Sequence, residues 1–454
     1  MARYEIVERD EAGRITKMYV ASGEGRVDVI KPKESKSLAQ KALDVFLPAG
    51  FPHSVSEDYI KYQIYDSLQA FSSSIAGMLS SRAVLEGVGV GDSTASPTTA
   101  LLLTVLQEST GRIGTILFAH RLGTALEPEC KMYRLAADIF NDAAMVIDCL
   151  SPAFPKPIRV VVLSCSSVLR ALCGVCAGSA KASLSAHFAR KGNLGEVNAK
   201  DSSQETVISL LGMLAGSIVV SWVSTPITTW SVLIALLSLH LAMNYAAVKA
   251  VSMRCLNRQR ANKVFSNMFQ HGRILSPTDV SQHERIFERD GVLRCADETI
   301  VGYCRIGVSL HLLLSRMGQR HKRTGSLDLH AIKLPELMDV FANEAYLLWF
   351  ADTDYEALIV LKEGCTPLDQ LKAWAHALLL AQRAQGRVVE RQPDIDDAST
   401  VHTRLAMLGK TLEEAKEAFA KYAKVLEQKG WDLDVAALET CAGSRIQLER
   451  RKEL

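Results

Sequence analysis

The sequence lacks the charge imbalance that would attract a polyanion. Its 52 lysines and arginines face 50 aspartates and glutamates, which leaves a net charge of +2. This balance gives no case for nucleic acid as a partner. Charge is also missing locally, because no Asp, Glu, Lys or Arg lies between Glu205 and Lys249. An interval of that length is too long for a single helix in a soluble core.

Dense cysteine spacing is absent as well. The ten cysteines are scattered from Cys130 to Cys441, which excludes a small secreted scaffold held by disulfides and favours a reducing compartment. The N-terminus carries Glu5, Glu8 and Arg9 before any apolar run, so no secretory signal is expected there.

Motifs for catalysis are missing too: no Ser/His/Asp set, zinc spacing or pair of carboxylates for glycoside chemistry emerges. The run from Gly87 to Gly91 lacks the dinucleotide spacing and the Gly-Lys-Ser/Thr end of a P-loop, so a tight turn or close helix contact is favoured. Cys173 and Cys176 have redox spacing but lie in an Ala/Gly/Ser-rich run, which favours two small core residues. No catalytic residue, cofactor or metal is expected, and an enzyme is the weakest hypothesis.

The uncharged interval predicts a transmembrane hairpin. It divides at Thr225 to Thr229 into segments 206–224 and 230–248, each close to the roughly 20 residues that span a bilayer core. Basic residues flank the hairpin on both sides, including Lys200 and Lys249. Both ends of a hairpin lie on the same side of the membrane, and basic flanks favour the cytosolic or equivalent side. Apolar stretches at 99–106 and 160–180 leave the number of further spans open.

The fold class expected is mainly α, with a helical membrane-associated domain that contains the hairpin. A small N-terminal β segment precedes it, and a small C-terminal α+β domain follows. Segment 344–362 predicts a β-hairpin, a helix is expected to begin near Ser276, and Thr411 with Glu414 predicts the capped start of a terminal helix that ends at Gly430. The expected domains are 1–45 (β-rich segment and linker), 46–260 (helical membrane domain), 261–330 (helical connector) and 331–454 (α+β domain with a terminal amphipathic helix).

Polar residues inside these apolar helices are candidates for function. Asp138, Asn141 and Asp142 are spaced to share a helix face, which in a membrane would mark a path for a cation, a proton or a substrate. In a peripheral helix they would instead be solvated or pair with Arg112 or Arg134.

Three further polar sets lie close to the hairpin or in the helices before it. The run from Lys200 to Thr206 precedes the first span, and either a functional patch or a polar helix cap explains it. Residues 110–114 place a cation between two glycines, for which a tight packed turn is favoured over an anion site. His240 and Asn244 are four apart on the second span, as expected of polar contacts between helices.

Several of these runs together resemble the root UV-B sensitive family. The resemblance covers most of residues 46–260 and extends to 361–374 in the C-terminal domain. It departs from the family pattern at His120 and Arg121, and Cys173 with Cys176 is not part of that pattern. The matching runs are Leu47 to Pro52, Ser54 to Ser56, Tyr59, Tyr62 with Gln63, Asp66 to Phe71, Gly87 to Gly91, Thr110 with Gly111 and Gly114, Arg134 to Asp142, Lys200 to Thr206, Asn244 with Tyr245, Leu361 to Gly364 and Leu371 to Trp374.

The resemblance implies a link to vitamin B6 homeostasis, UV-B responses, early seedling development and auxin transport in plants, without an established reaction or catalytic residues. Two hypotheses follow: a non-enzymatic, transporter-like or scaffold membrane protein in small-molecule homeostasis, or a membrane anchor that recruits a soluble pyridoxal-dependent enzyme. Other partners considered are the lipid bilayer and a family paralogue or second copy of the chain. The candidate polar patch comprises Asp66, Gln69, Arg112, Asp138, Asn141, Asp142, Lys200, Asp201, Ser202, Gln204, Glu205 and Asn244.

Overall fold

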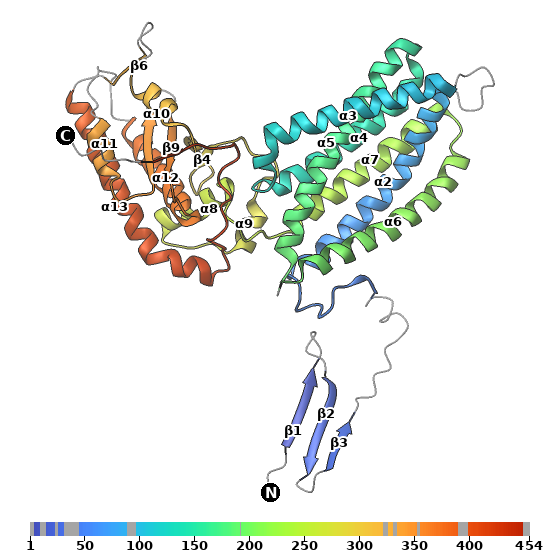
Figure 1. Ribbon diagram of the computed structural model, residues 1–454, viewed down its shortest axis with the longest axis horizontal. Helices are drawn as coiled ribbons and strands as arrows, with labels where there is room; N and C mark the ends of the chain where they lie inside the picture. Colours follow the sequence, from blue (N-terminus) through green and yellow to red (C-terminus); the bar gives the residue numbers. More distant parts are fainter. Residues whose placement is uncertain are drawn as a thin grey trace. The chain divides into compact units, whose positions relative to one another are not determined.

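The computed structural model describes residues 4–9, 15–22, 26–30, 45–88, 97–190, 192–320, 326–329, 334–351, 355–388 and 398–447. The chain is mostly helical and divides into two compact units (Figure 1). One holds residues 1–120 and 130–251, and the other holds 121–129 and 252–454. Gly89 and Gly91 of the glycine run lie outside the described residues.

The N-terminal segment forms a three-stranded antiparallel sheet, as its alternating sequence predicts. Its strands are β1 (Tyr4–Arg9), β2 (Ile15–Ser22) and β3 (Arg26–Ile30), paired in the order β1-β2-β3. The residues of β1 and β3 are exposed on both faces. No apolar core therefore forms within these two strands.

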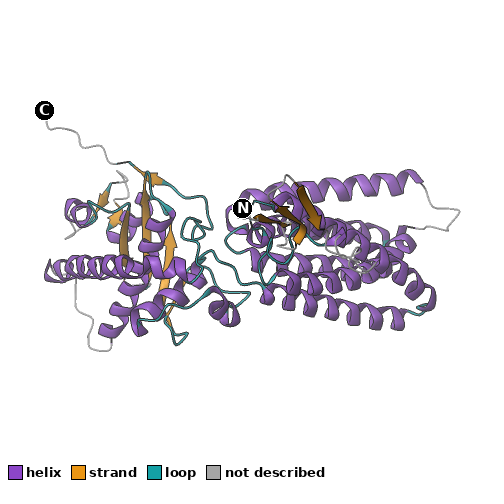
Figure 2. Ribbon diagram, turned by 90° about the horizontal axis from the view of Figure 1, so that it is seen from below, coloured by secondary structure: helices purple, strands orange, loops and turns teal. Residues whose placement is uncertain are grey.

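Long helices make up the rest of the first unit (Figure 2). Helix α2 packs against α6 and α7, and α4 packs against α5. The 3-10 turn η1 follows α4 directly. In chain order these elements are α2 (Tyr59–Val88), α3 (Pro97–Leu126), α4 (Cys130–Leu150), η1 (Ser151–Ala153), α5 (Lys156–Phe188), α6 (Leu194–Trp222) and α7 (Pro226–Ala250).

The helix pair at 206–224 and 230–248 is confirmed as helical, although each helix is longer than predicted. Helix α6 begins at Leu194, so the Lys200 run lies inside it and does not cap it. Thr225 caps α7 with its hydroxyl oxygen, which accepts from the Thr228 amide at 3.2 Å, and Pro226 occupies the first turn. The structure adds α5, so three helices in the described part of the chain are long and apolar enough to cross a membrane.

Glycine allows α6 to approach α2 closely. A Cβ atom at Gly212 would lie 2.6 Å from the Ser74 Cβ, and one at Gly216 would lie 2.9 Å from the Met78 Cγ. These glycines are four residues apart, the spacing that brings helix backbones together in membranes.

The second unit is built around one mixed sheet. Strand β9 pairs antiparallel with β8 and parallel with β5 and β10, and β4 pairs antiparallel with β5. The predicted hairpin at 344–362 is confirmed as β8 and β9. The sheet strands are β4 (Val292–Arg294), β5 (Ile300–Ile306), β8 (Tyr346–Ala351), β9 (Glu356–Lys362) and β10 (Arg445–Ile446), and β6 (Gln319–Arg320) pairs separately with β7 (Leu327–Asp328).

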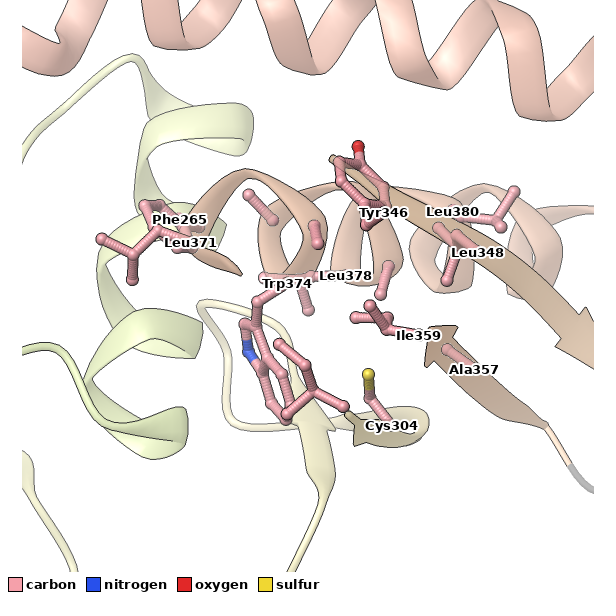
Figure 3. Close-up of a cluster of buried hydrophobic side chains, with 14 of the residues drawn as sticks. Phe265, Cys304, Tyr346, Leu348, Ala357, Ile359, Leu371, Trp374, Leu378 and Leu380 are labelled. Atoms are coloured by element: carbon pink, nitrogen blue, oxygen red, sulfur yellow. The ribbon is translucent and has the colours of Figure 1, made fainter. Parts of the chain in front are cut away.

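Helices pack on this sheet around a core centred on Trp374 (Figure 3). Trp374 on α12 is fully buried, and its indole N–H donates to Asn262 Oδ1 of α8 at 2.9 Å. The unit's helices are α8 (Arg258–His271), α9 (Pro277–His283), α10 (Leu310–Met317), α11 (Leu334–Val340), α12 (Pro367–Val388) and α13 (Ala398–Gln428).

Two expectations for this unit need correction. Segment 261–330 is not only a helical connector, because it contains β4 and β5 of the central sheet. Thr411 does not cap a helix start, because it lies in the middle of α13, where it is buried and bonded to His376 at 2.9 Å. The expected start at Ser276 is confirmed by a capping box with Asp279, and Gly430 follows the end of α13 with a φ of +97°.

Candidate functional site

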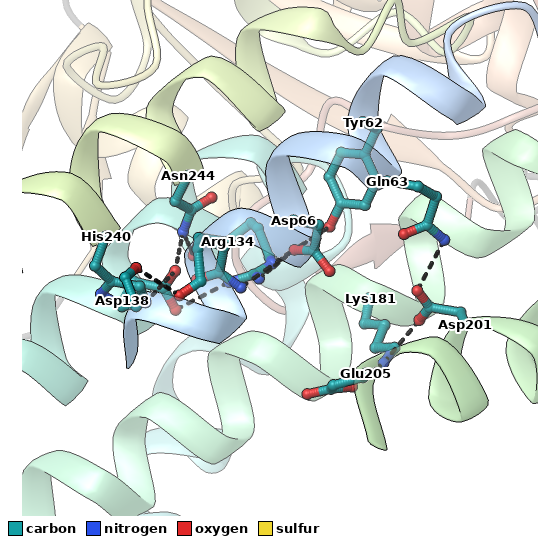
Figure 4. Close-up of polar contacts among 12 residues, drawn as sticks. Tyr62, Gln63, Asp66, Arg134, Asp138, Lys181, Asp201, Glu205, His240 and Asn244 are labelled. Carbon is teal, nitrogen blue, oxygen red and sulfur yellow. Dashed lines mark hydrogen bonds and ion pairs between the residues drawn. The ribbon is translucent and has the colours of Figure 1, made fainter. Parts of the chain in front are cut away.

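A buried ion network centred on Arg134 joins α2, α4 and α7 (Figure 4). The Arg134 guanidinium lies on α4 and contacts Asp66 Oδ1 of α2 at 2.7 Å through Nη2 and Asp138 Oδ1, one turn further along α4, at 3.0 Å through Nη1. Tyr62 lies beside this pair, with its hydroxyl 3.3 Å from Asp66 Oδ1. Arg134 is buried, so these ion pairs are largely shielded from water.

Helix α7 closes the network from the other side. The His240 ring lies between two carboxylates of α4, with Nδ1 2.7 Å from Asp142 Oδ1 and Nε2 3.4 Å from Asp138 Oδ2. The Asn244 amide donates to Asp138 Oδ2 and to the Arg134 carbonyl, the latter at 3.2 Å. His240 and Asn244 are fully buried, which makes these contacts structural links between α4 and α7.

Gln69 of α2 connects Arg134, Asp138 and His240 of the same network. With its amide oriented to suit its neighbours, the oxygen accepts from Arg134 Nη2 at 2.8 Å. The amide nitrogen is then 2.7 Å from Asp138 Oδ2 and 2.7 Å from His240 Nε2. We refer to Tyr62, Asp66, Gln69, Arg134, Asp138, Asp142, His240 and Asn244 as the ion network.

Negative charge is in excess in the ion network. Three carboxylates, Asp66, Asp138 and Asp142, face one guanidinium, so the network is neutral only if it also holds protons or another cation. Two of its buried atoms, Asp142 Oδ2 and Asn244 Oδ1, have no hydrogen-bond partner. A buried polar atom without a partner is costly, so Asp142 Oδ2 and Asn244 Oδ1 are the atoms of the network that an additional hydrogen-bond donor would satisfy.

The Lys200 run serves a different set of contacts. Asp201 accepts from Gln63 Nε2 at 2.9 Å and pairs with Lys181 of α5 at 2.7 Å. Glu205 also contacts Lys181, at 2.6 Å. These contacts tie α6 to α2 and α5.

Two neighbouring side chains of the same run hold the segment that precedes α2. Lys200 Nζ donates to the Val45 carbonyl at 2.6 Å, and Gln204 Nε2 donates to the Phe46 carbonyl at 2.7 Å. Ser202 accepts from the Thr206 hydroxyl through its backbone carbonyl, at 2.8 Å, within α6 itself.

Two of the candidate residues lie outside the ion network. Arg112 is not a partner of Asp138 or Asp142, because its side chain is 81% exposed and contacts Glu108 on its own helix at 3.4 Å. Asn141 donates to Ser73 Oγ at 3.3 Å, so it does not join the two aspartates of its helix. The tight packing expected around Gly111 is present, since a Cβ there would lie 2.8 Å from Ser167 Oγ.

Sequence reasoning undervalued three members of the ion network. Tyr62, Arg134 and His240 are not part of the candidate polar patch. Arg134 is expected only as an alternative partner for the carboxylates, and the contacts between helices expected of His240 and Asn244 are confirmed. The signal for His240 was present, since a histidine in an uncharged membrane-length segment needs a polar partner. Among the described residues, no group of three or more His, Cys, Asp or Glu is arranged to hold a metal ion.

Comparison with known families covers nearly the whole chain. Residues 32–272 match the "Vitamin B6 photo-protection and homoeostasis domain", and residues 273–440 match "Root UVB sensitive protein, C-terminal". All eight residues of the ion network lie within the first of these matches.

Similar individual proteins come from an amoeba and a plant. RUS family member 1 of Dictyostelium discoideum is 39% identical over 291 residues, which cover 62% of this chain but only 55% of that protein. Protein root UVB sensitive 3 of Arabidopsis thaliana is 33% identical over 344 residues, or 75% of each chain. Protein root UVB sensitive 2, chloroplastic, of Arabidopsis thaliana is 23% identical over 409 residues, 90% of this chain and 85% of that one. No solved structure matches.

Proposed function

Because the chain belongs to the root UV-B sensitive family, we propose that it is an integral membrane protein that binds and moves a small polar molecule of the vitamin B6 group. The proposed role is non-enzymatic, and in this proposal the ion network links protonation to movement of the helices. The ligand class follows from the description of the matched domain, and the mechanism rests on the buried excess of carboxylates.

The outer surface of the helices supports insertion in a bilayer. Only 17%, 11% and 33% of the most apolar segments of α5, α6 and α7 are buried inside the protein. Trp222 at the end of α6 is 84% exposed, and Ile227 at the start of α7 is 79% exposed. Apolar surface of this extent is unfavourable in water and is what lipid chains cover. Trp222 and Trp230 flank the turn, where interfacial aromatic residues are expected.

The ion network gives such a membrane domain a means of handling charge. Ionisable groups within membrane helices are costly and mark ion, proton or substrate paths. The His240 ring, held between Asp138 and Asp142, can carry a proton on either nitrogen, and the free Asp142 Oδ2 can accept another. Gain or loss of a proton here changes the attraction between α4 and α7, which couples protonation to helix movement.

The first experiment establishes membrane insertion. Alkaline carbonate extraction of membranes from expressing cells should leave the chain in the pellet. Release by carbonate would contradict the proposal, because α6 and α7 would then be a buried pair in a soluble or peripheral protein.

The second experiment measures movement of a ligand. Purified protein in liposomes should take up labelled pyridoxine, and Asp138→Asn and Asp142→Asn should reduce uptake by about tenfold or more at equal protein abundance. Arg112→Gln is the matched control, because Arg112 is exposed and lies outside the network. Wild-type liposomes without uptake of pyridoxine, pyridoxal or pyridoxal phosphate would overturn the transport role.

The second unit supports an alternative role as a membrane-anchored scaffold. Its sheet and helices form a core of their own, with Trp374 and Tyr346 fully buried. Such a unit could recruit a soluble pyridoxal-dependent enzyme while the helices of the first unit anchor the chain. A chain that ends at Val251 should stay in the membrane but lose the partner, whereas a cut at 331 would separate β5 from β9. Partner recovery with the shortened chain would contradict the scaffold role.

A further inference from the structure

A second polar region lies apart from the ion network, around a cavity of about 390 Å³ lined by α2, α3, α4 and α5. Its volume is within the range of small-molecule pockets, which is roughly 300–1,000 Å³. Helix α3 meets α5 at Gly111, and the Ser167 hydroxyl of α5 donates to the Gln107 carbonyl of α3 at 2.6 Å. Both Gln107 and Ser167 line the cavity.

The cavity offers a cation that is only partly neutralised. Arg170 of α5 donates through Nη2 to Asp148 Oδ2 and to Ser80 Oγ, the latter at 3.4 Å. The Asp148 side chain is 5% exposed, whereas the Arg170 side chain is 43% exposed. One part of the guanidinium therefore anchors to α4 and α2, and the rest remains accessible from the cavity.

An acidic group and an apolar wall complete the lining. Glu108 of α3 lines the cavity with a side chain that is 63% exposed and contacts Arg112 at 3.4 Å, and it adds a second carboxylate to that of Asp148. Val84, Leu85 and Leu163 supply apolar surface. A guanidinium, a carboxylate and an apolar wall together suit a small ring that carries both an acidic and a basic group.

We infer that this cavity is the binding site for a small amphoteric ring compound, with its anionic group on Arg170 and its protonated nitrogen on Glu108. The inference rests on the proposed function, which it deepens by giving the ligand a place. Asp148 lies six residues beyond Asp142 on α4, a rise of about 9 Å along the helix. Buried Met145 and Leu79 lie in the apolar cluster of the same helices, so the ligand site and the ion network are separate polar regions.

Pyridoxine is a suitable probe, because it has an acidic phenol and a basic ring nitrogen and lacks an aldehyde that would react with lysines. Its binding is measured by equilibrium dialysis against the purified full chain. Glu108→Gln should weaken binding about tenfold, as expected for loss of one charged hydrogen-bond partner. Arg112→Gln removes the same Glu108–Arg112 pair without touching the cavity, so it should bind pyridoxine at least as tightly as the wild type.

A second pair of variants tests the shape of the cavity. Leu85→Trp puts a larger side chain at its wall and should weaken binding more than about tenfold. Leu68→Trp is the control, because Leu68 is a similarly exposed leucine of α2 outside the cavity lining, and it should leave binding unchanged.

The outcomes separate the cavity from the proposed function. Pyridoxine binding that stays at the wild-type level in both Glu108→Gln and Leu85→Trp would contradict the cavity as the binding site. Uptake that is lost in Asp138→Asn would still support the transport role in that case. If these variants lose pyridoxine binding but the wild type takes up no pyridoxine, the cavity is supported as the binding site and the transport role is contradicted. A wild-type chain that neither binds nor moves pyridoxine overturns both.

Discussion

His240 Nδ1 lies 2.7 Å from Asp142 Oδ1, although 98 residues separate the two in the sequence. The same ring faces Asp138 Oδ2 at 3.4 Å. His240 thus stands between two carboxylates of α4 that would otherwise repel each other, and it links the last long apolar helix to the first half of the helical unit.

Replacing His240 should therefore destabilise the packing of α4 against α7. His240→Ala leaves Asp142 without its partner, and the expected loss is about 1–3 kcal/mol of unfolding free energy. Thermal unfolding of the purified full chain in detergent measures it, and Asp142→Asn in the same background should recover part of the loss. An unchanged midpoint in His240→Ala would contradict the structural role of the pair.

The close approach of α6 to α2 gives a second prediction. Gly212→Ala places a Cβ 2.6 Å from the Ser74 Cβ and 2.9 Å from the Phe71 carbonyl oxygen, so the helices must separate. The expected result is a lower thermal midpoint and less protein in the membrane. Gly178→Ala on α5 is the control, because a Cβ there meets nothing within 4 Å and alanine favours the helix. Equal behaviour of the two variants would show that this contact is not tight.

The hydrogen bonds from Arg82 to the turn between α6 and α7 give a third prediction. Its guanidinium donates to the carbonyls of Val220 and Val223 at 3.1 and 2.6 Å and to the Thr229 hydroxyl at 2.9 Å. Arg82→Gln should leave the Val220 and Val223 carbonyls without this donor, loosen the turn and speed proteolysis within residues 223–229, as read by mass spectrometry. Arg112→Gln should leave the cleavage rate unchanged.

His376 gives a pH dependence to the second unit. Complete burial lowers the pKa of His376 to about 3, with its ring held between Tyr346 and Thr411 at 3.1 and 2.9 Å. The unfolded chain takes up a proton below pH 6.5 and the folded chain does not. The contribution of His376 to the free energy of unfolding should thus be fully present above pH 6.5. It should decrease as the pH is lowered towards the pKa of the folded state, by at most about 1.4 kcal/mol per pH unit.

The matched measurement compares thermal midpoints of the full chain at pH 7.5 and pH 5.5. His376→Gln should show a smaller difference between the two than the wild type, because its side chain does not titrate. His271→Gln replaces an exposed histidine of α8 and should keep the wild-type difference. If His376→Gln keeps the wild-type difference in thermal midpoint between the two pH values, other groups cause the pH dependence.

The sequence predicted those features that depend on local pattern. An uncharged interval interrupted at Pro226 is sufficient for two helices and a turn, and the alternation around Leu347 and Val360 is sufficient for paired strands. Periodicity also placed Asp138 and Asp142 on one face of a helix. In each case the interacting residues are close together in the sequence, so the local pattern is enough to predict the structure.

Long-range contacts could not be predicted in this way. Asp66 meets Arg134 across 68 residues, and β5 joins β9 across about fifty, so neither pairing leaves a local signal. Arg112 is a candidate because it lies between two glycines, yet the orientation of α3 leaves its side chain exposed. Thr411 and Glu414 matched a capping pattern in the middle of a helix, because α13 begins thirteen residues earlier, at Ala398.

The separation of Asp138 and Asp142 from His240 and Asn244 also bears on how the protein is made. A ribosome synthesises both carboxylates of α4 about a hundred residues before their partners on α7. If the helices are delivered to a membrane one after another, α4 arrives with Arg134 able to pair with Asp138 on the same helix, whereas Asp142 lacks its partner until α7 follows. A nascent chain that stops before residue 240 therefore leaves Asp142 without its histidine partner, and the polar contacts of α4 are completed only when α7 has been made.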